Sequence, residues 1–164
     1  MTITTSSIGA AIDYLVTACT AAFGATALVF DGVPSSGTEL TLADRIWIGF
    51  SPPNPELPVA VGDQEFATLG AYTRNETSAI VCAVEHGSGS TAMQPARDQA
   101  FALLRTVETL LRGVGGNPGD TTLGGAVLFS GIGSGIEVYQ TQDTNGANVL
   151  IQFHVQCTAR LTAS

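Results

Sequence analysis

The clearest pattern of polar and apolar positions runs through residues 149–161, where the two kinds of side chain alternate strictly. The apolar members of the series are Val149, Ile151, Phe153, Val155, Cys157, Ala159 and Leu161. Alternation with a period of two places such residues on one face of a β-strand. The Asn145-Gly146 pair just before the series is a preferred hairpin turn. The C-terminal part of the chain is therefore predicted to form a long β-hairpin with one buried face and one largely solvated face.

Two other segments repeat their apolar residues at the spacing of an amphipathic helix. The first spans residues 6–23, between a Thr-Ser-Ser cluster that can cap a helix and Gly24, which can end one. Its apolar stripe comprises Ile8, Ile12, Leu15, Cys19 and Phe23. The second begins near Pro95, which suits a first helical turn, and ends at Gly113. Its apolar stripe comprises Ala100, Phe101, Leu104, Val107 and Leu111.

Three shorter segments, residues 26–31, 44–50 and 76–86, are rich in strand-forming residues. The third is apolar on both faces near its middle, so we expect it to be covered on both sides. Residues 51–58 contain four prolines and cannot form a central strand, because each proline removes a ladder donor. We expect a stiff, exposed excursion there, and a mobile connection over the glycine-rich residues 113–125.

The order helix, strands, helix, hairpin predicts an α+β fold. We expect an antiparallel-rich mixed sheet packed by an N-terminal and a central helix and completed by the C-terminal hairpin. Residues 1–164 show no internal repeat and no boundary, so a single domain is expected.

Composition narrows the function classes. With 45% apolar and 12% charged residues, the chain is expected to fold rather than stay disordered. The net charge is −8 and no basic cluster is present, which argues against tight nucleic-acid binding. All six basic residues are arginines, typical of a high-G+C bacterial or phage genome. No apolar run is long enough to span a membrane, and no basic residue precedes Arg45, so neither a membrane anchor nor a signal peptide is expected.

The three cysteines, Cys19, Cys82 and Cys157, show no C-x-x-C spacing and fall on apolar sides of predicted elements. We interpret them as small buried core residues rather than metal or redox groups, consistent with folding in the cytoplasm.

The stretch "AVLFSGIGSGIEVY" at residues 126–139 raises the question of a phosphate-binding loop. A dinucleotide fingerprint would need its third glycine at Ile136, and a helix should follow it. Strand-type residues follow instead, and without lysine no Walker motif is possible. We therefore expect Gly131, Gly133 and Gly135 to mark a bulge or bend in a strand.

Catalytic signatures are equally weak. Glu85 and His86 are neighbours at a strand end, so their side chains should diverge to opposite faces. His154 falls on the solvated face of the last strand, and Ser134 lies between Ile132 and Ile136 rather than in a G-x-S-x-G elbow. We expect no catalytic residue, no metal site and no cofactor.

The remaining features favour association, although the loops could also simply be loops. A long open strand edge needs a cover, and a ring of identical subunits provides one. Aromatic and polar residues on otherwise polar strand faces are the candidate subunit contacts. These are Trp47, Tyr139, His154, Gln156 and Arg160.

The whole order of elements resembles the tail terminator (tail completion) proteins of long-tailed phages, especially those that infect actinobacteria. The resemblance rests on "RIWIGF" with its Pro-rich turn, "GDQEF…LG…R.E…I" before a central strand, the helix "PARDQAFALLRTVETLLR" and the hairpin. It implies a homohexameric ring that caps the tail tube, ends tube polymerisation and joins the tail to the head. The implied partners are the tail tube protein, a head–tail connector protein and the passing genome. The implied location is the neck of the virion, after synthesis in the host cytoplasm.

Under this resemblance, carboxylates around the ring lumen would repel DNA so that the genome passes without being held. The candidates are Asp31, Glu39, Glu56, Asp63 and Glu65. Two alternatives stay open. One is another neck or tail-tube ring protein, and the tube protein should expose a long hairpin and form stacked rings. The other is a small monomeric α+β enzyme or ligand-binding domain with a pocket near His86 or His154.

Overall fold

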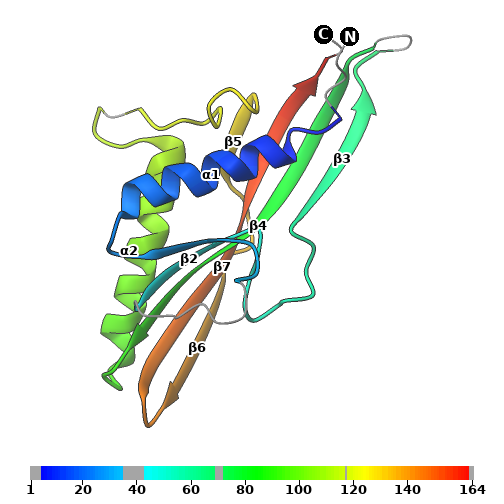
Figure 1. The fold of residues 1–164 in the computed structure, drawn as a ribbon. Coiled ribbons are helices and arrows are strands. Elements are labelled where there is room, and N and C mark those ends of the chain that lie inside the picture. The colour runs from blue at the N-terminus through cyan, green and yellow to red at the C-terminus, as the bar shows by residue number, and fades with distance from the viewer. Residues whose placement is uncertain (1–4, 35–42, 69–71, 117, 163–164) are drawn as a thin grey trace.

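The computed structural model describes residues 5–34, 43–68, 72–116 and 118–162. These residues form an α+β fold with a seven-stranded, mostly antiparallel mixed sheet, as the sequence predicts (Figure 1). The helices are α1 (Ile8–Phe23) and α2 (Met93–Arg112). The strands are β1 (Leu28–Asp31), β2 (Asp44–Ile48), β3 (Ala60–Phe66), β4 (Arg74–Ser88), β5 (Phe129–Ile132), β6 (Glu137–Asp143) and β7 (Gly146–Leu161).

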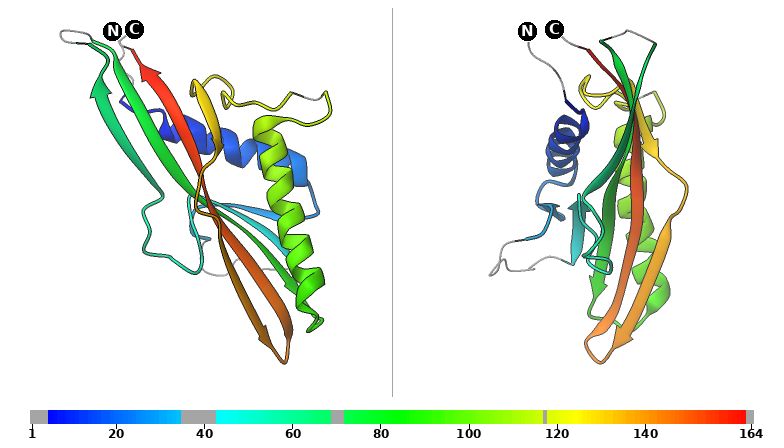
Figure 2. Two further views of the ribbon diagram at one scale, coloured as in Figure 1. Left: turned by 180° about the vertical axis from the view of Figure 1, so that it is seen from behind. Right: turned by 90° about the vertical axis from the view of Figure 1, so that its right-hand side faces the viewer.

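The sheet is built on one long antiparallel pair, β4 with β7, whose register runs from Arg74 opposite Leu161 to Ser88 opposite Ala147. Each long strand carries two shorter neighbours in succession along its outer edge. β3 and then β2 pair with β4, and β6 and then β5 pair with β7, all antiparallel. β1 extends the sheet in parallel beside β2. The sheet is therefore narrow and long, with open edges on both flanks among the described residues (Figure 2).

Both helices pack on the same face of the sheet and enclose the main core. α1 contributes Leu15 and Phe23, and α2 contributes Leu104 and Val107. The strands supply the strictly alternating residues that the sequence pattern identifies, from Val149 to Leu161 along β7. Neither of the two described helices is long and apolar enough to cross a membrane.

All three cysteines are free and buried in this core, as predicted. Burial raises the pKa of the Cys19 thiol to about 12 and that of the Cys157 thiol to about 11. Burial likewise raises the pKa of the Cys82 thiol, in the middle of β4. The thiols are therefore protonated and shielded at neutral pH, which makes them poor nucleophiles.

The opposite face of the sheet carries a smaller aromatic cluster. Trp47 stacks on Phe30 with ring centroids 4.4 Å apart and meets Phe50 edge-on at 5.7 Å. Beneath these rings lie Ala83 and Leu150. β4 is thus covered on both sides at its middle, as predicted.

Part of the second face of β7 differs from expectation. Leu150 and Gln152 are buried by the aromatic cluster and by the Pro-rich segment, whereas Gln156, Thr158 and Arg160 are exposed. The solvated face predicted for the whole strand is confirmed only in its C-terminal half.

The Pro-rich segment 51–58 forms no strand and is exposed at most of its residues, as predicted, and it is also fastened to other parts of the chain. The Asn54 side chain donates hydrogen bonds to Tyr139 Oη at 3.1 Å and to Gln152 Oε1 at 2.7 Å. Ser51 is buried at the start of the segment. These contacts fasten the segment to β6 and β7 of the same chain.

The glycine-rich connection after α2 is also more ordered than expected. Leu123 is 1% exposed within the main core. The Asp120 carboxylate accepts hydrogen bonds from the Thr122 hydroxyl and the Gly124 amide, which lower its pKa to about 2. The Asp120 amide donates to Leu110 O at 2.8 Å. The expectation of a mobile connection does not account for these contacts, which tie the segment to the core and to α2.

The glycines of the 126–139 stretch interrupt a strand, as predicted. β5 ends at Ile132 and β6 begins at Glu137, and both pair with β7. Between them, Gly133 donates its amide to His154 O at 2.9 Å and Gly135 has φ +96°, a conformation that favours glycine. The joint lets one edge of β7 serve two successive strands.

Candidate functional site

His86 lies in a polar contact on the helix side of the sheet. Its Nδ1 is 2.5 Å from Asp44 Oδ1, and Asp44 Oδ2 accepts a hydrogen bond from Gln99 Nε2 at 3.0 Å. The contact ties β4 to β2 and to the first half of α2. The contact therefore links three elements of the fold.

Glu85 points to the opposite face, as the strand geometry predicts. Its carboxylate accepts hydrogen bonds from Trp47 Nε1 at 3.2 Å and Asn148 Nδ2 at 3.0 Å. Arg45 Nε lies 3.5 Å from the same group. Glu85 and His86 therefore form no joint site, and each is satisfied by its own partners.

Glu76 is a second buried carboxylate, and no pattern in the sequence pointed to it. It accepts hydrogen bonds from the Ser7 amide at 2.8 Å, the Ser7 hydroxyl at 2.5 Å and Gln64 Nε2 at 2.6 Å. Burial raises the pKa of Glu76, but these hydrogen bonds outweigh burial and hold the pKa below its ordinary value. Because the Ser7 amide lies at the start of α1, the carboxylate caps the positive end of that helix. Glu76 thus joins α1, β3 and β4.

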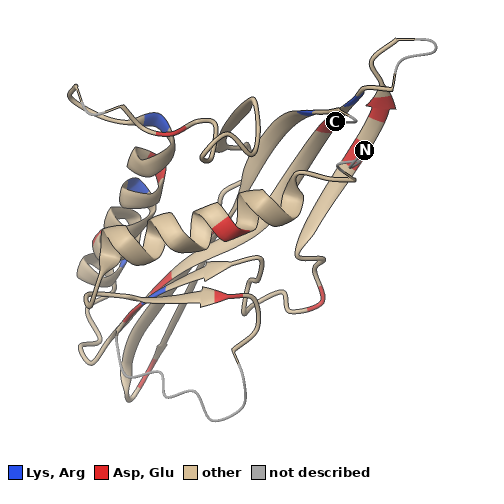
Figure 3. Cartoon of the chain, turned by 45° about the horizontal axis from the view of Figure 1, so that its top comes forward, with Lys and Arg blue, Asp and Glu red and all other residues tan. Residues whose placement is uncertain are grey.

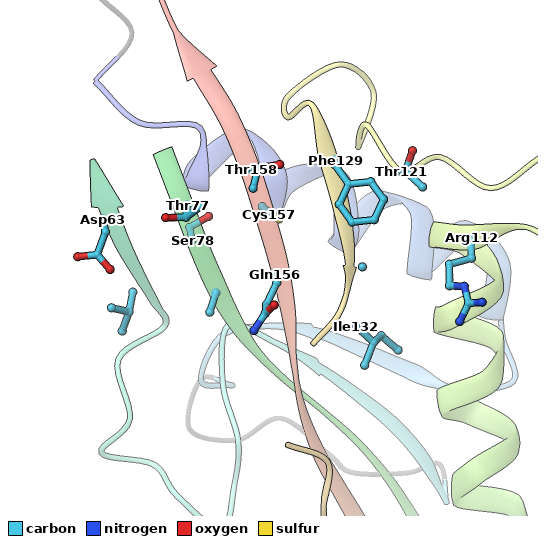
Figure 4. A pocket seen from close by; sticks show the side chains of 13 residues that line it. Asp63, Thr77, Ser78, Arg112, Thr121, Phe129, Ile132, Gln156, Cys157 and Thr158 are labelled. Atoms are coloured by element: carbon cyan, nitrogen blue, oxygen red, sulfur yellow. The ribbon is translucent and has the colours of Figure 1, made fainter. Parts of the chain in front are cut away.

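A hollow lies on the sheet face opposite the helices, across β3, β4, β7 and β5 (Figure 4). Its volume is about 830 Å³. Asp63 marks its β3 flank, and Arg112, at the end of α2, marks the flank beyond β5. Neither His86 nor His154 lines it.

The floor of this hollow consists of two rows of residues in register across four strands. One row is Asp63, Thr77, Thr158 and Phe129, and the other is Val61, Ala79, Gln156 and Gly131. Most of these side chains are small or uncharged. The floor is a shallow surface without convergent polar groups, which suits contact with another chain better than chemistry on a small molecule.

The candidate subunit contacts are not all available. Trp47 is 3% exposed, because Phe30 and Phe50 pack on it within the chain, and it is corrected to a core residue. Tyr139 and His154 are half-buried. Gln156 and Arg160 are exposed on the open half of β7 and remain candidates.

The candidate lumen carboxylates separate into groups. Asp63 and Glu65 are exposed on β3 and share the face that carries the hollow. Asp31 is exposed at the end of β1, and Glu56 is exposed in the Pro-rich segment. Figure 3 shows acidic segments along β3 and both signs of charge along α2. Glu39 lies outside the described residues.

Exposed apolar side chains gather along both flanks of the sheet. On the β3 flank, Phe66 is 71% exposed, and on the opposite flank Phe129 is 57% exposed. The further members are Val59 and Val61 on the first flank and Leu128, Ile136 and Val138 on the second. The sequence pattern did not identify the exposed apolar side chains of either flank, and it predicted no strand at β3.

Within the described part of the chain, no group of His, Cys, Asp and Glu is arranged to hold a metal ion. No protein-family model matches the sequence, and no curated protein matches it.

Proposed function

We propose that this chain is a structural protein of a phage virion, whose ring caps the tail tube, ends tube polymerisation and joins the tail to the head. One observation carries the proposal: the sheet has open edges on both flanks, and exposed apolar side chains follow both. Exposed strand edges and apolar patches mark association surfaces in soluble proteins. Nothing in the geometry of the described residues calls for a catalytic role.

A ring explains why two different edges are open. When each copy contacts the next through two different surfaces, the contacts propagate from copy to copy, and the copies close into a ring when the rotation between them permits. The expected ring is a hexamer. The exposed carboxylates suit such a ring. Asp31, Asp63 and Glu65 are exposed, and none of them has an ion pair within the described chain. Carboxylates around a lumen would repel the phosphates of the passing genome.

A second candidate function is that of a tail-tube protein. The observation that favours it is the β6–β7 hairpin, which extends to the end of the sheet opposite β3 and β5 (Figures 1 and 2). A projecting hairpin can reach a neighbouring ring in a stacked tube. The two candidates differ in a single property, because a terminator stops at one ring and a tube protein stacks.

The test is the mass of the purified protein by light scattering, alone and mixed with tail tubes from the same phage or prophage locus, with electron microscopy of the products. A ring-sized species, alone or at tube ends, together with a fixed tube length, supports the terminator. Stacked rings or fibres of the protein alone support the tube protein instead. A monomer that neither binds tubes nor limits their length contradicts both.

The enzyme alternative has its own control. Substituting both His86 and His154 by alanine should abolish any activity that depends on them. Under the proposed function the double variant changes assembly at most.

A further inference from the structure

The open edges at one end of the sheet belong to β3 on one flank and β5 on the other. No described strand pairs with the outer edge of either. β3 runs antiparallel to β4, β4 to β7, and β7 to β5, so β3 and β5 run in opposite directions. A second copy in the same orientation therefore presents its β3 antiparallel to the β5 of the first.

Charge on the strands selects among the possible pairings. If β3 paired with β3 of another copy, Asp63 and Glu65 would face carboxylates of the same kind. If β3 paired with β6, Glu137 and Asp143 would share a face with them, since both lie opposite residues of the open face of β7. Like charges directly opposite are destabilising in a sheet. β5, with the sequence Phe-Ser-Gly-Ile, carries no charge at all.

Complementary groups lie at the two flanks of the same hollow. Asp63 begins the row that ends at Phe129, and Arg112 lines the hollow beyond that end. Arg112 Nη1 lies 2.6 Å from Glu108 of its own helix, and both side chains are largely exposed. Exposed pairs of this kind contribute little, so Arg112 can exchange this partner for another carboxylate.

From these observations we propose that the β5 edge of one copy pairs with the β3 edge of the next, in antiparallel fashion. In the unshifted register Asp63 of the second copy reaches Phe129 and Arg112 of the first. Val61 of the second copy lies beside Gly131, where the missing side chain leaves room. The hollow then continues from copy to copy as one surface. The inference rests on the proposed ring, for which it names the subunit contact.

Cross-linking of two variants, each with one added cysteine, tests this contact even when association is weak. Val61→Cys and Gly131→Cys proteins, one with an affinity tag, are mixed and treated with a short bis-maleimide. The native cysteines are buried and should not react with the maleimide. A Cβ at Gly131 meets only the Phe129 ring, at 3.7 Å, which is an ordinary contact. Within one chain the two positions are three strand spacings apart, roughly 14 Å, so the product to score is the mixed dimer.

The matched control replaces Val61→Cys by Val33→Cys, which is 69% exposed but lies just beyond β1. We expect the Val61–Gly131 mixture to give roughly tenfold more mixed dimer than the control, because pairing holds the two thiols at cross-linking distance. Equal yields from the two mixtures overturn the contact.

Charge exchange tests the register. Asp63→Arg alone and Arg112→Asp alone each place like charges across the contact and should lower the cross-linking yield roughly tenfold. Both substitutions in one chain restore opposite charges and should recover most of the yield. Asp31→Arg is the control of equal charge change and should have no effect, and circular dichroism checks that each variant folds. A double variant as weak as the single variants overturns the Asp63–Arg112 contact.

These outcomes are separable from those for the proposed function. If the cross-links form in a protein that does not bind tail tubes, the subunit contact is supported and the role in the tail is contradicted. If rings form at tube ends but the cross-link does not, the role in the tail is supported and the proposed contact is contradicted.

Discussion

Glu76 shows how one side chain can connect three elements. Its carboxylate is 2% exposed and is satisfied by Ser7 at the start of α1 and Gln64 on β3. Ser7 forms no side-chain cap with the backbone of its own helix, so the carboxylate from β4 takes that part. A fixed negative charge at a helix N-terminus is favourable because of the helix dipole.

Replacing Glu76→Gln should destabilise the protein by about 1.5–3 kcal/mol at neutral pH, the range for hydrogen bonds to a charged group. The new amide would also direct a donor at Gln64 Nε2, which is itself a donor. Urea unfolding measures the change. Glu56→Gln, at an exposed carboxylate of the Pro-rich segment, is the control and should leave stability unchanged.

The pH dependence of the same variant gives a second readout. The folded pKa of Glu76 lies below its ordinary value of 4.5, so the carboxylate contributes its full stability above pH 4.5. That contribution is lost as the pH falls through the folded pKa. The gap between wild type and Glu76→Gln should therefore narrow below pH 4.5, and a constant gap across this range contradicts the assignment.

At the scale of elements, the sequence predicts those segments whose two faces differ in environment. β7 and both helices show clear periodicity because one face packs into the core and the other does not. β3 shows no such periodicity, because six of its seven residues are exposed and its two faces therefore do not differ in environment. β5 is four residues long and contains a glycine, so its pattern does not show where the strand ends and the bend begins.

The candidate site was predicted less well for the same reason. Alternation along β2 predicted which face of the strand carries Trp47. The burial of Trp47, however, depends on the Phe30 and Phe50 rings that pack on it, and the pattern of β2 does not show this packing. Likewise, Asp63 and Arg112 come to one hollow only through the register of four strands. Pairing between remote strands is a tertiary property that a local pattern does not contain.

Substitution by alanine should destabilise the protein to different extents at two glycines, Gly119 and Gly133. A Cβ at Gly119 would collide with the Gly113 amide nitrogen, where only backbone movement makes room. A Cβ at Gly133 would lie 2.6 Å from Cδ of Gln156, an exposed side chain that can rotate away. We expect Gly119→Ala to cost about 1–3 kcal/mol and Gly133→Ala less than about 1 kcal/mol. Thermal unfolding of the two variants compares them directly, and equal losses would contradict this explanation.

For the whole molecule, the division between core and flank predicts which substitutions affect folding and which affect association. Phe66→Asp, on the exposed β3 flank, should change the free energy of unfolding by less than about 0.5 kcal/mol and weaken self-association in light scattering. Ile151→Ala, in the main core, should cost about 2–5 kcal/mol. A large loss of stability in Phe66→Asp would show that this side chain supports the fold of the single chain.

The long β4–β7 pair also has a consequence for how the chain is made. A ribosome completes β4 well before β7, because α2, β5 and β6 lie between them in sequence. During that interval Ile80, Cys82 and Val84 lack the strand that later pairs beside them. Sheets dominated by such remote pairings fold slowly, and unpaired apolar strands invite aggregation. The yield of native protein should therefore depend on chaperones that hold the nascent chain until β7 emerges.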